Sequence, residues 1–124
     1  GDYMRGYNIQ GAGLIFIITN DGWWRNTPGH RQHNQYARLR AIESRKSIAR
    51  AASTGISSFI NQRGDILKQS AWWEPTSMNQ TLNKNHRLTF FTLHGNILGK
   101  LSLFLSFLLV LYMGSQWIIR RRSQ

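Results

Sequence analysis

The sequence has no cysteine, and acidic residues are scarce: five Asp and Glu accompany 16 Lys and Arg, so the formal net charge is +11. Without cysteine, the chain itself supplies no disulfide, no thiolate metal ligand and no sulfur nucleophile. The few carboxylates form no obvious pair for general acid–base catalysis. Such a positive charge is typical of proteins that bind nucleic acid or an anionic membrane surface.

Several catalytic and binding motifs are missing as well. The sequence has no G-x-S-x-G elbow for a serine nucleophile, no glycine-rich phosphate loop and no H-E-x-x-H metal motif. RNP, helix-turn-helix and zinc-finger signatures are also absent, so we do not expect nucleic acid as a partner. His30 and His33 could share one face of a helix, but a metal site needs more ligands. We expect the two rings to hydrogen-bond loop carbonyls instead.

The stretch with the clearest functional character begins at the apolar run LIFII, residues 14–18. Its β-branched and aromatic residues predict a buried strand. The next four residues, TNDG, have the composition of a turn, and two tryptophans follow. In α/β proteins, binding sites lie at the carboxyl ends of strands, where such loops emerge. The candidate site residues are therefore Asn20, Asp21, Trp23 and Trp24.

A basic segment, residues 29–52, comes next. Small and apolar residues recur in it at spacings of four and seven, which predicts one helix with a narrow seam against a sheet; they are Ala37, Ala41, Ile48 and Ala52. Glu43 lies three residues after Arg40, within helical ion-pairing distance. The basic residues on the rest of the helix could bind phosphates, or they could face solvent or another subunit. The sequence leaves both readings open.

A β-hairpin is predicted after this helix. Residues 56–60 and 66–70 form its strands, and residues 61–65 form its turn, in which Gly64 supplies a positive φ. Two further β-rich segments follow, a short edge strand at residues 81–83 and a strand at residues 88–93.

The first ten residues predict a short helix that leads into the first strand. Tyr3 and Tyr7 lie one turn apart in it and share a face.

The composition changes completely at residues 101–119, which carry no charge. A helix of this length rises about 28 Å, close to the thickness of a bilayer's hydrocarbon core. A buried core helix is the alternative, but the three arginines that follow at residues 120–122 favour a membrane span with Trp117 at the interface. The positive-inside rule then places the C-terminus in the cytoplasm and the preceding domain on the opposite side.

Four motifs occur in the same order as in a known family, and the sequence resembles the end of the apolipoprotein N-acyltransferases. The motifs are ITNDGWW, GHRQH, ARLRAIE and TGISSFINQRGDIL. The resemblance implies an α/β fold: a partial α-β-β-α sandwich of the nitrilase (carbon–nitrogen hydrolase) type over residues 1–96, a transmembrane helix over 97–119 and a basic cytoplasmic tail over 120–124. It also implies a bacterial inner membrane, with the domain on the periplasmic side. Because the chain opens at Gly1 without Met or a signal-peptide pattern, we expect part of a longer protein.

The resemblance further implies a reaction. An acyl chain moves from a phospholipid donor to the N-terminal diacylglyceryl-cysteine of an apolipoprotein acceptor, through a cysteine thioester and without a cofactor or metal. None of the family's Glu-Lys-Cys triad maps onto this sequence, so we expect the isolated chain to be inactive. The strand and loop that follow the cysteine do map, and they would line the acyl or headgroup pocket with Asn20, Asp21, Trp23 and Trp24. Packing of the two indoles against lipid is the alternative.

Three positions depart from the family pattern: Arg25 replaces Gly, Ser53 replaces Asn and Asn96 replaces Asp. Arg25 is expected to change the path of the loop, because glycine tolerates backbone angles that arginine does not. Two other functions remain open. One is a non-enzymatic, single-span membrane protein whose basic ectodomain binds anionic lipid or a partner. The other is a soluble amidase of the same superfamily, which the apolar run disfavours.

Overall fold

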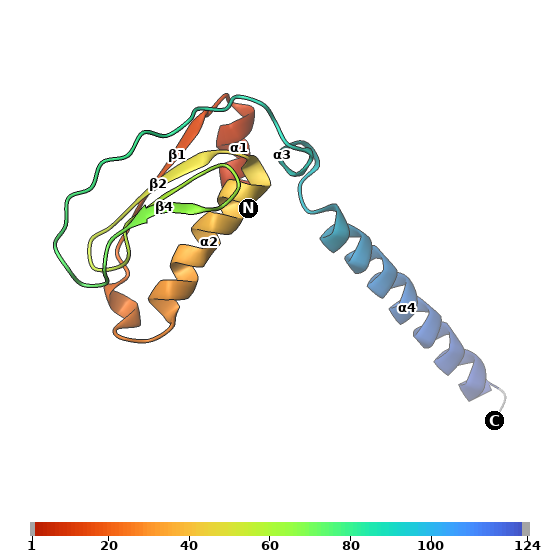
Figure 1. Ribbon diagram of the computed structural model, residues 1–124. Helices are drawn as coiled ribbons and strands as arrows, with labels where there is room; N and C mark the ends of the chain where they lie inside the picture. The colour runs from red at the N-terminus through yellow and green to blue at the C-terminus, as the bar shows by residue number, and fades with distance from the viewer. Residues whose placement is uncertain (1, 123–124) are drawn as a thin grey trace.

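The computed structural model describes residues 2–122, which form an α/β domain followed by one long helix (Figure 1). The helices of the domain are α1 (Asp2–Ile9), α2 (Gly29–Ser44) and α3 (Phe90–His94), with a short 3₁₀ turn, η1, at Gly22–Trp24. The strands are β1 (Leu14–Thr19), β2 (Ser47–Ala52), β3 (Ser58–Ile60) and β4 (Ile66–Gln69), and α4 (Ile97–Arg122) extends away from them. The predicted α/β class with one C-terminal apolar helix is confirmed.

Within the described residues, the strands form one sheet in the order β1-β2-β3-β4. β1 and β2 are parallel, with Thr19 opposite Ala52, so their carboxyl ends lie side by side. β3 and β4 complete the sheet as antiparallel neighbours. This arrangement brings the loops after β1 and β2 to the same edge of the sheet, where sites form in α/β proteins.

The predicted strand at residues 14–18 is present, but the expectation that it is buried is only half right. Ile15 and Ile17 pack against the core, whereas Phe16 and Ile18 are 72% and 89% exposed. Successive side chains of a strand point to opposite faces, and only one face of β1 is covered. The core itself is small, formed by Ala37, Ala41, Ile48 and Ile60.

The single helix predicted over residues 29–52 is wrong in its last third. The helix ends at Ser44, Arg45 adopts a left-handed conformation with φ 52°, and residues from Ser47 onward form β2. Ala37 and Ala41 do form the buried seam of α2, but Ile48 reaches the core from the strand. The pairing of β2 with two neighbouring strands outweighs helical spacing, because each strand residue gains ladder hydrogen bonds and a packed face.

The hairpin prediction is confirmed. β3 and β4 pair around the turn at residues 61–65, and Gly64 has φ 86°. A register irregularity lies between Phe59 and Ile60.

The long segment of residues 71–89 connects β4 to α3 along the outside of the sheet (Figure 1). The edge strand predicted at residues 81–83 is wrong, since the described chain is irregular there. Two side chains at the start of β2 hold this segment instead. Ser47 Oγ donates to the Asn83 carbonyl at 3.0 Å, and Lys46, the residue before the strand, donates from Nζ to the Asn85 and Arg87 carbonyls. Burial lowers the pKa of this Lys46 amine.

The strand predicted at residues 88–93 is also wrong, because Phe90–His94 forms the helix α3. Thr89 caps its N-terminus by accepting from Thr92 N at 3.1 Å. Arg5, from α1, donates to the carbonyls of Thr92 and Leu93 at the other end. Arg5, which is 87 residues from Thr92 in the chain, therefore satisfies backbone carbonyls that so short a helix leaves unpaired.

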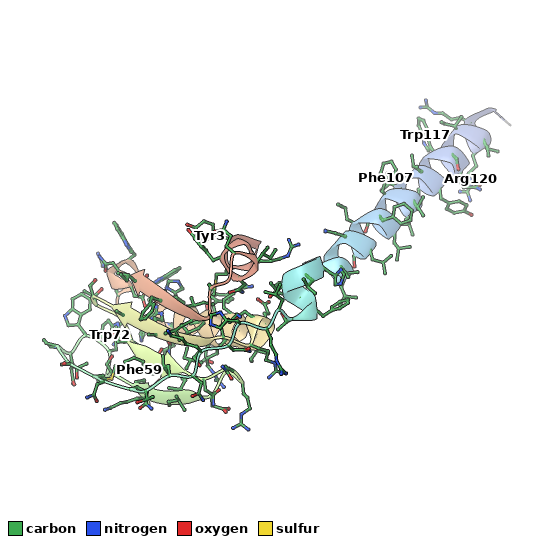
Figure 2. The ribbon with its side chains drawn as sticks, turned by 90° about the horizontal axis from the view of Figure 1, so that it is seen from above. Tyr3, Phe59, Trp72, Phe107, Trp117 and Arg120 are labelled. Atoms are coloured by element: carbon green, nitrogen blue, oxygen red, sulfur yellow. The ribbon has the colours of Figure 1, made fainter. Side chains whose placement is uncertain are left out.

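The apolar helix α4 is confirmed, and residues Ile97–Arg121 are long and apolar enough to cross a membrane. Asn96, one of the departures from the family pattern, accepts from Gly99 N at 2.9 Å and so caps α4, a role that Asp also fills. Trp117 lies near the distal end of α4 (Figure 2), and the Arg121 guanidinium sits 4.2 Å from the centroid of its indole.

Candidate functional site

The loop after β1 is anchored by a buried ion pair. Asp21 is the second residue beyond the strand, and its side chain is fully buried. Arg50 reaches it from β2, with 2.6 Å between Arg50 Nη2 and Asp21 Oδ2. His33 from α2 contacts the other carboxylate oxygen, 2.8 Å from its Nδ1. Because a carboxylate only accepts, His33 must carry its proton on Nδ1 to make this bond. A strand end, a second strand and a helix thus meet at one carboxylate.

The surroundings of this carboxylate fit its charged form. Burial alone raises the pKa of Asp21, but the hydrogen bonds from Arg50 and His33 outweigh it and hold the pKa below its usual value. Arg50 also donates to the Ile56 carbonyl, so both terminal nitrogens of its guanidinium are engaged. Gly55 makes room for the carboxylate, since a Cβ there would lie 2.7 Å from Asp21 Cγ.

Asn20 shapes the loop above the ion pair. Its Oδ1 accepts from Gly22 N at 3.0 Å, the local turn that Asn favours. The same oxygen accepts from Thr54 Oγ1 at 2.7 Å, which ties the loop after β1 to the loop after β2. Ser53 extends the parallel ladder with a 3.0 Å hydrogen bond from its N to the Thr19 carbonyl.

The two indoles of the loop have different environments. Trp23 is 86% exposed and, with Asn20, Gly22 and Arg25, borders a shallow depression open to solvent. Trp24 is 47% exposed and lies against Gly29 at the start of α2, where a Cβ would approach the indole to 2.5 Å. Thr27 Oγ1 donates to the Trp24 carbonyl at 2.5 Å and holds that arrangement.

Arg25 follows the indoles with φ 46° and ψ −150°. Residues other than glycine rarely adopt such angles, and they cost of order 1–3 kcal/mol. Arg25, at a position where the resemblance predicts glycine, therefore introduces backbone strain into the loop.

The four predicted site residues lie in one loop, but only two of them border the same depression. Asn20 and Trp23 border the open depression, whereas Asp21 is in the interior and anchors the loop from beneath. The expected ion pair of Arg40 and Glu43 is present. Arg50 falls in the part of the predicted basic helix that is in fact β2, and its side chain is buried against Asp21. The signal that could have found it is the strand period of two, which puts Arg50 on the same face as buried Ile48.

The two histidines do not act as the predicted pair bound to loop carbonyls. His33 contacts the Asp21 carboxylate, while His30 stacks on Trp72 with 5.0 Å between ring centroids. Among residues 2–122, no three His, Cys, Asp or Glu side chains come together in a way that could hold a metal ion.

Fold and site together define an α/β protein with a polar, tryptophan-bearing loop at the carboxyl ends of two parallel strands and a C-terminal helix able to span a membrane. The carbon-nitrogen hydrolase family model matches residues 1–85. The chain therefore belongs to the carbon-nitrogen hydrolase family.

Several curated proteins similar to this chain share one name, apolipoprotein N-acyltransferase. The chain is 36% identical over 98% of its length to the apolipoprotein N-acyltransferase of Pasteurella multocida and 30% identical over 99% to that of Haemophilus influenzae. It is 34% identical over 71% of its length to the protein of the same name from Chlorobaculum tepidum. These matches cover 23%, 23% and 16% of the relatives, so the chain spans less than a quarter of their length.

Proposed function

We propose that this chain acts as the C-terminal region of an apolipoprotein N-acyltransferase. The observation that carries the proposal is the alignment of 98% of the chain with one such enzyme, together with an apolar helix of membrane-spanning length in the structure. The alternative of a soluble amidase does not account for α4, whose apolar side chains are exposed throughout.

The proposed reaction transfers an acyl chain from a phospholipid to the α-amino group of an apolipoprotein's N-terminal diacylglyceryl-cysteine. In the first step, a cysteine thiolate attacks the acyl ester, forming a thioester and releasing the lysophospholipid. In the second, the amine attacks the thioester and regenerates the thiolate. The 124 residues contain no cysteine, so the sulfur must come from outside them. Neither step calls for a metal or cofactor.

The proposed contribution of this chain is the wall of the acyl or headgroup pocket. Trp23 and Trp24 offer apolar faces to a lipid chain and N–H groups to polar atoms. Asn20 borders the same depression as Trp23. The role assigned to Asp21 is to hold this loop through Arg50 and His33, because its carboxylate is already fully engaged.

We also propose a membrane orientation. The arginines at residues 120–122 and the indole of Trp117 suit the cytoplasmic interface of a bacterial inner membrane, and the α/β domain then faces the periplasm. A protease added to spheroplasts should therefore degrade the domain and spare a C-terminal epitope tag.

The test of the function is a chimera. The corresponding region of the Pasteurella multocida enzyme is replaced by these 124 residues, and phospholipid-to-lipopeptide transfer is measured in detergent. We expect transfer by the chimera and none by the 124-residue chain alone, which has no sulfur on which to form the thioester. Transfer by the isolated chain would contradict the proposed mechanism. A chimera that folds and inserts but transfers nothing would contradict the assignment of this region.

A further inference from the structure

A second concave site lies on the domain, between the first turns of α2 and the segment that follows β4. It is an open cavity of about 390 Å³, and the residues that matter in its wall are His30, Arg31, Asn34, Ser70 and Trp72. Figure 2 shows Trp72 at the side of the domain away from α4. None of the loop residues proposed to bind the acyl chain lines it.

The wall of this cavity is rich in hydrogen-bond donors. Among the described residues that line it there is no Asp or Glu, while Arg31 brings a positive charge. Asn34 uses its oxygen to accept from Ser58 Oγ at 2.8 Å, and Ser70 uses its oxygen to accept from Ser57 N at 3.0 Å. The amide NH₂ of Asn34 and the hydroxyl proton of Ser70 therefore remain as donors.

Two nitrogens beside the cavity are buried without a partner among the described residues, His30 Nδ1 and Trp72 Nε1. The His30 side chain is almost wholly enclosed, with the residue 2% exposed, and its ring stacks on the indole at an interplanar angle of 22°. The indole nitrogen can only donate, so it calls for an acceptor oxygen. Buried polar groups are seldom left unpaired, which points to a missing ligand atom.

The start of α2 adds a third feature. Pro28 occupies its N-cap position and has no side-chain group that could cap the helix, while Thr27 Oγ1 accepts from Gly29 N at 3.4 Å. His30 and Arg31 belong to the first turn of this 16-residue helix and line the cavity, so the cavity lies beside the helix's positive end.

We propose that this cavity is a binding site for a phosphate group. Arg31 would pair with the charge, Asn34 and Ser70 would donate to its oxygens, and the start of α2 would add its dipole. Because both orphaned nitrogens are buried, a phosphate oxygen would reach them only when the indole of Trp72 turns outward. Trp73 next to it has φ 64°, a strained angle for tryptophan, and marks the hinge for that turn. The site is independent of the proposed acyl transfer.

The experiment uses the full chain, labelled with ¹⁵N and held in dodecylmaltoside, which contains no phosphate. The indole N–H signal of Trp72, assigned with the Trp72→Phe variant, is followed while inorganic phosphate is added at constant ionic strength. We expect a saturable shift, weakened about tenfold in Arg31→Gln because a charged hydrogen bond is lost. Arg63→Gln, which changes an exposed arginine in the β3–β4 turn, should alter the affinity less than about twofold.

A parallel titration with glycerophosphoglycerol identifies the source of the phosphate. Tighter binding of this soluble diester assigns the site to a lipid headgroup, and tighter binding of inorganic phosphate assigns it to a free phosphate or monoester. If neither compound produces a saturable shift, or if Arg31→Gln binds both as tightly as the unchanged chain, the proposal is wrong. Circular dichroism of the Arg31→Gln variant confirms that the comparison is made on folded protein.

Discussion

The loop after β1 and the turn between β3 and β4 begin in the same way and are stabilised differently. In both, an Asn oxygen accepts from backbone N–H groups two or more residues ahead: Asn20 from Gly22, and Asn61 from Arg63 and Asp65. The β3–β4 turn adds an ion pair between Arg63 and Asp65 at 2.9 Å. The two side chains are 78% and 52% exposed, respectively. The loop after β1 instead places Asp21 in the interior against an arginine from another strand.

The difference shows which contacts hold a candidate site in place. An exposed pair four or fewer residues apart forms within the turn itself and is screened by water. A buried pair from residues 29 positions apart forms only when β1, β2 and α2 are packed together. The conformation of the loop after β1 therefore depends on the packing of the whole sheet, whereas that of the β3–β4 turn depends mainly on its own five residues.

The largest effect should come from Arg50→Met. It leaves the Asp21 carboxylate buried without its main partner, which costs about 3–5 kcal/mol of unfolding free energy. Denaturant unfolding of the chain in detergent, followed by circular dichroism, measures the loss. The double variant Asp21→Asn/Arg50→Met should recover a large part of it, because no unpaired charge remains. Equal losses in the single and double variants would show that the ion pair does not anchor the loop.

The same measurement over pH tests the sign of the interaction. The folded-state pKa of Asp21 lies below its ordinary value of about 3.9, so its contribution is complete above that pH and is lost as the pH falls further. In Arg50→Met, burial without its main partner favours protonation of Asp21, so the cost of that substitution should shrink as the pH is lowered from 7 to 4.

The next effect concerns activity in the chimeric acyltransferase. Trp23 is exposed, so Trp23→Ala should leave the melting temperature nearly unchanged, yet reduce the transfer rate by the equivalent of about 2 kcal/mol if the indole contacts lipid. Phe59→Ala is the contrast, because a half-buried strand residue should lose stability first. Wild-type transfer rates in both Trp23→Ala and Trp24→Ala would remove the loop from the site. Matching losses of stability in these variants and in Phe59→Ala would favour packing instead.

A third variant tests the space around the ion pair. Gly55→Ala places a Cβ against the Asp21 carboxylate and should cost about 1–3 kcal/mol. Gly6→Ala is the matched control, since nothing lies within 4 Å of a Cβ there and alanine favours the helix by about 1 kcal/mol. The two substitutions should shift the unfolding midpoint in opposite directions. A neutral Gly55→Ala would mean that the loop moves freely.

Arg25→Gly should stabilise the chain by about 1 kcal/mol, because glycine adopts φ 46° and ψ −150° without strain. The gain is smaller than the strain itself, since glycine adds freedom to the unfolded chain. Arg25→Ala keeps the strain and removes the charge, so it should not reproduce the gain. If it does, charge repulsion rather than backbone geometry explains the effect.

The smallest effect is expected from Asp65→Asn in the β3–β4 turn. The hydrogen bonds from Asn61 and Arg63 lower the pKa of Asp65, but the side chain is in water. The melting temperature should change far less than in Arg50→Met, and added salt should reduce the change further. A loss as large as that of Arg50→Met would erase the distinction between the two turns.

Local pattern alone determined much of this protein. Residues 101–119 form a helix because an uncharged apolar run of that length has few alternatives, and α4 contains all of them. Glycine and Asn placed the β3–β4 turn, since Gly64 tolerates φ 86° and Asn61 bonds to the next backbone groups. The first strand and the loop that carries Trp23 followed from an apolar run that stops at a turn sequence. The motifs of that loop and of the hairpin also indicated the family.

The tertiary structure decided where helix gives way to strand and which charges are buried. Residues after Ser44 fit a helical spacing, yet β2 forms because β1 and β3 are available on either side. Phe90–His94 is rich in β-forming residues, yet α3 forms because Arg5 satisfies its last carbonyls. In the sequence, nothing distinguishes Arg50 from the other basic residues around it, and only the sheet places it against Asp21. In each case the deciding partner lies far away in the chain, where local periodicity carries no information about it.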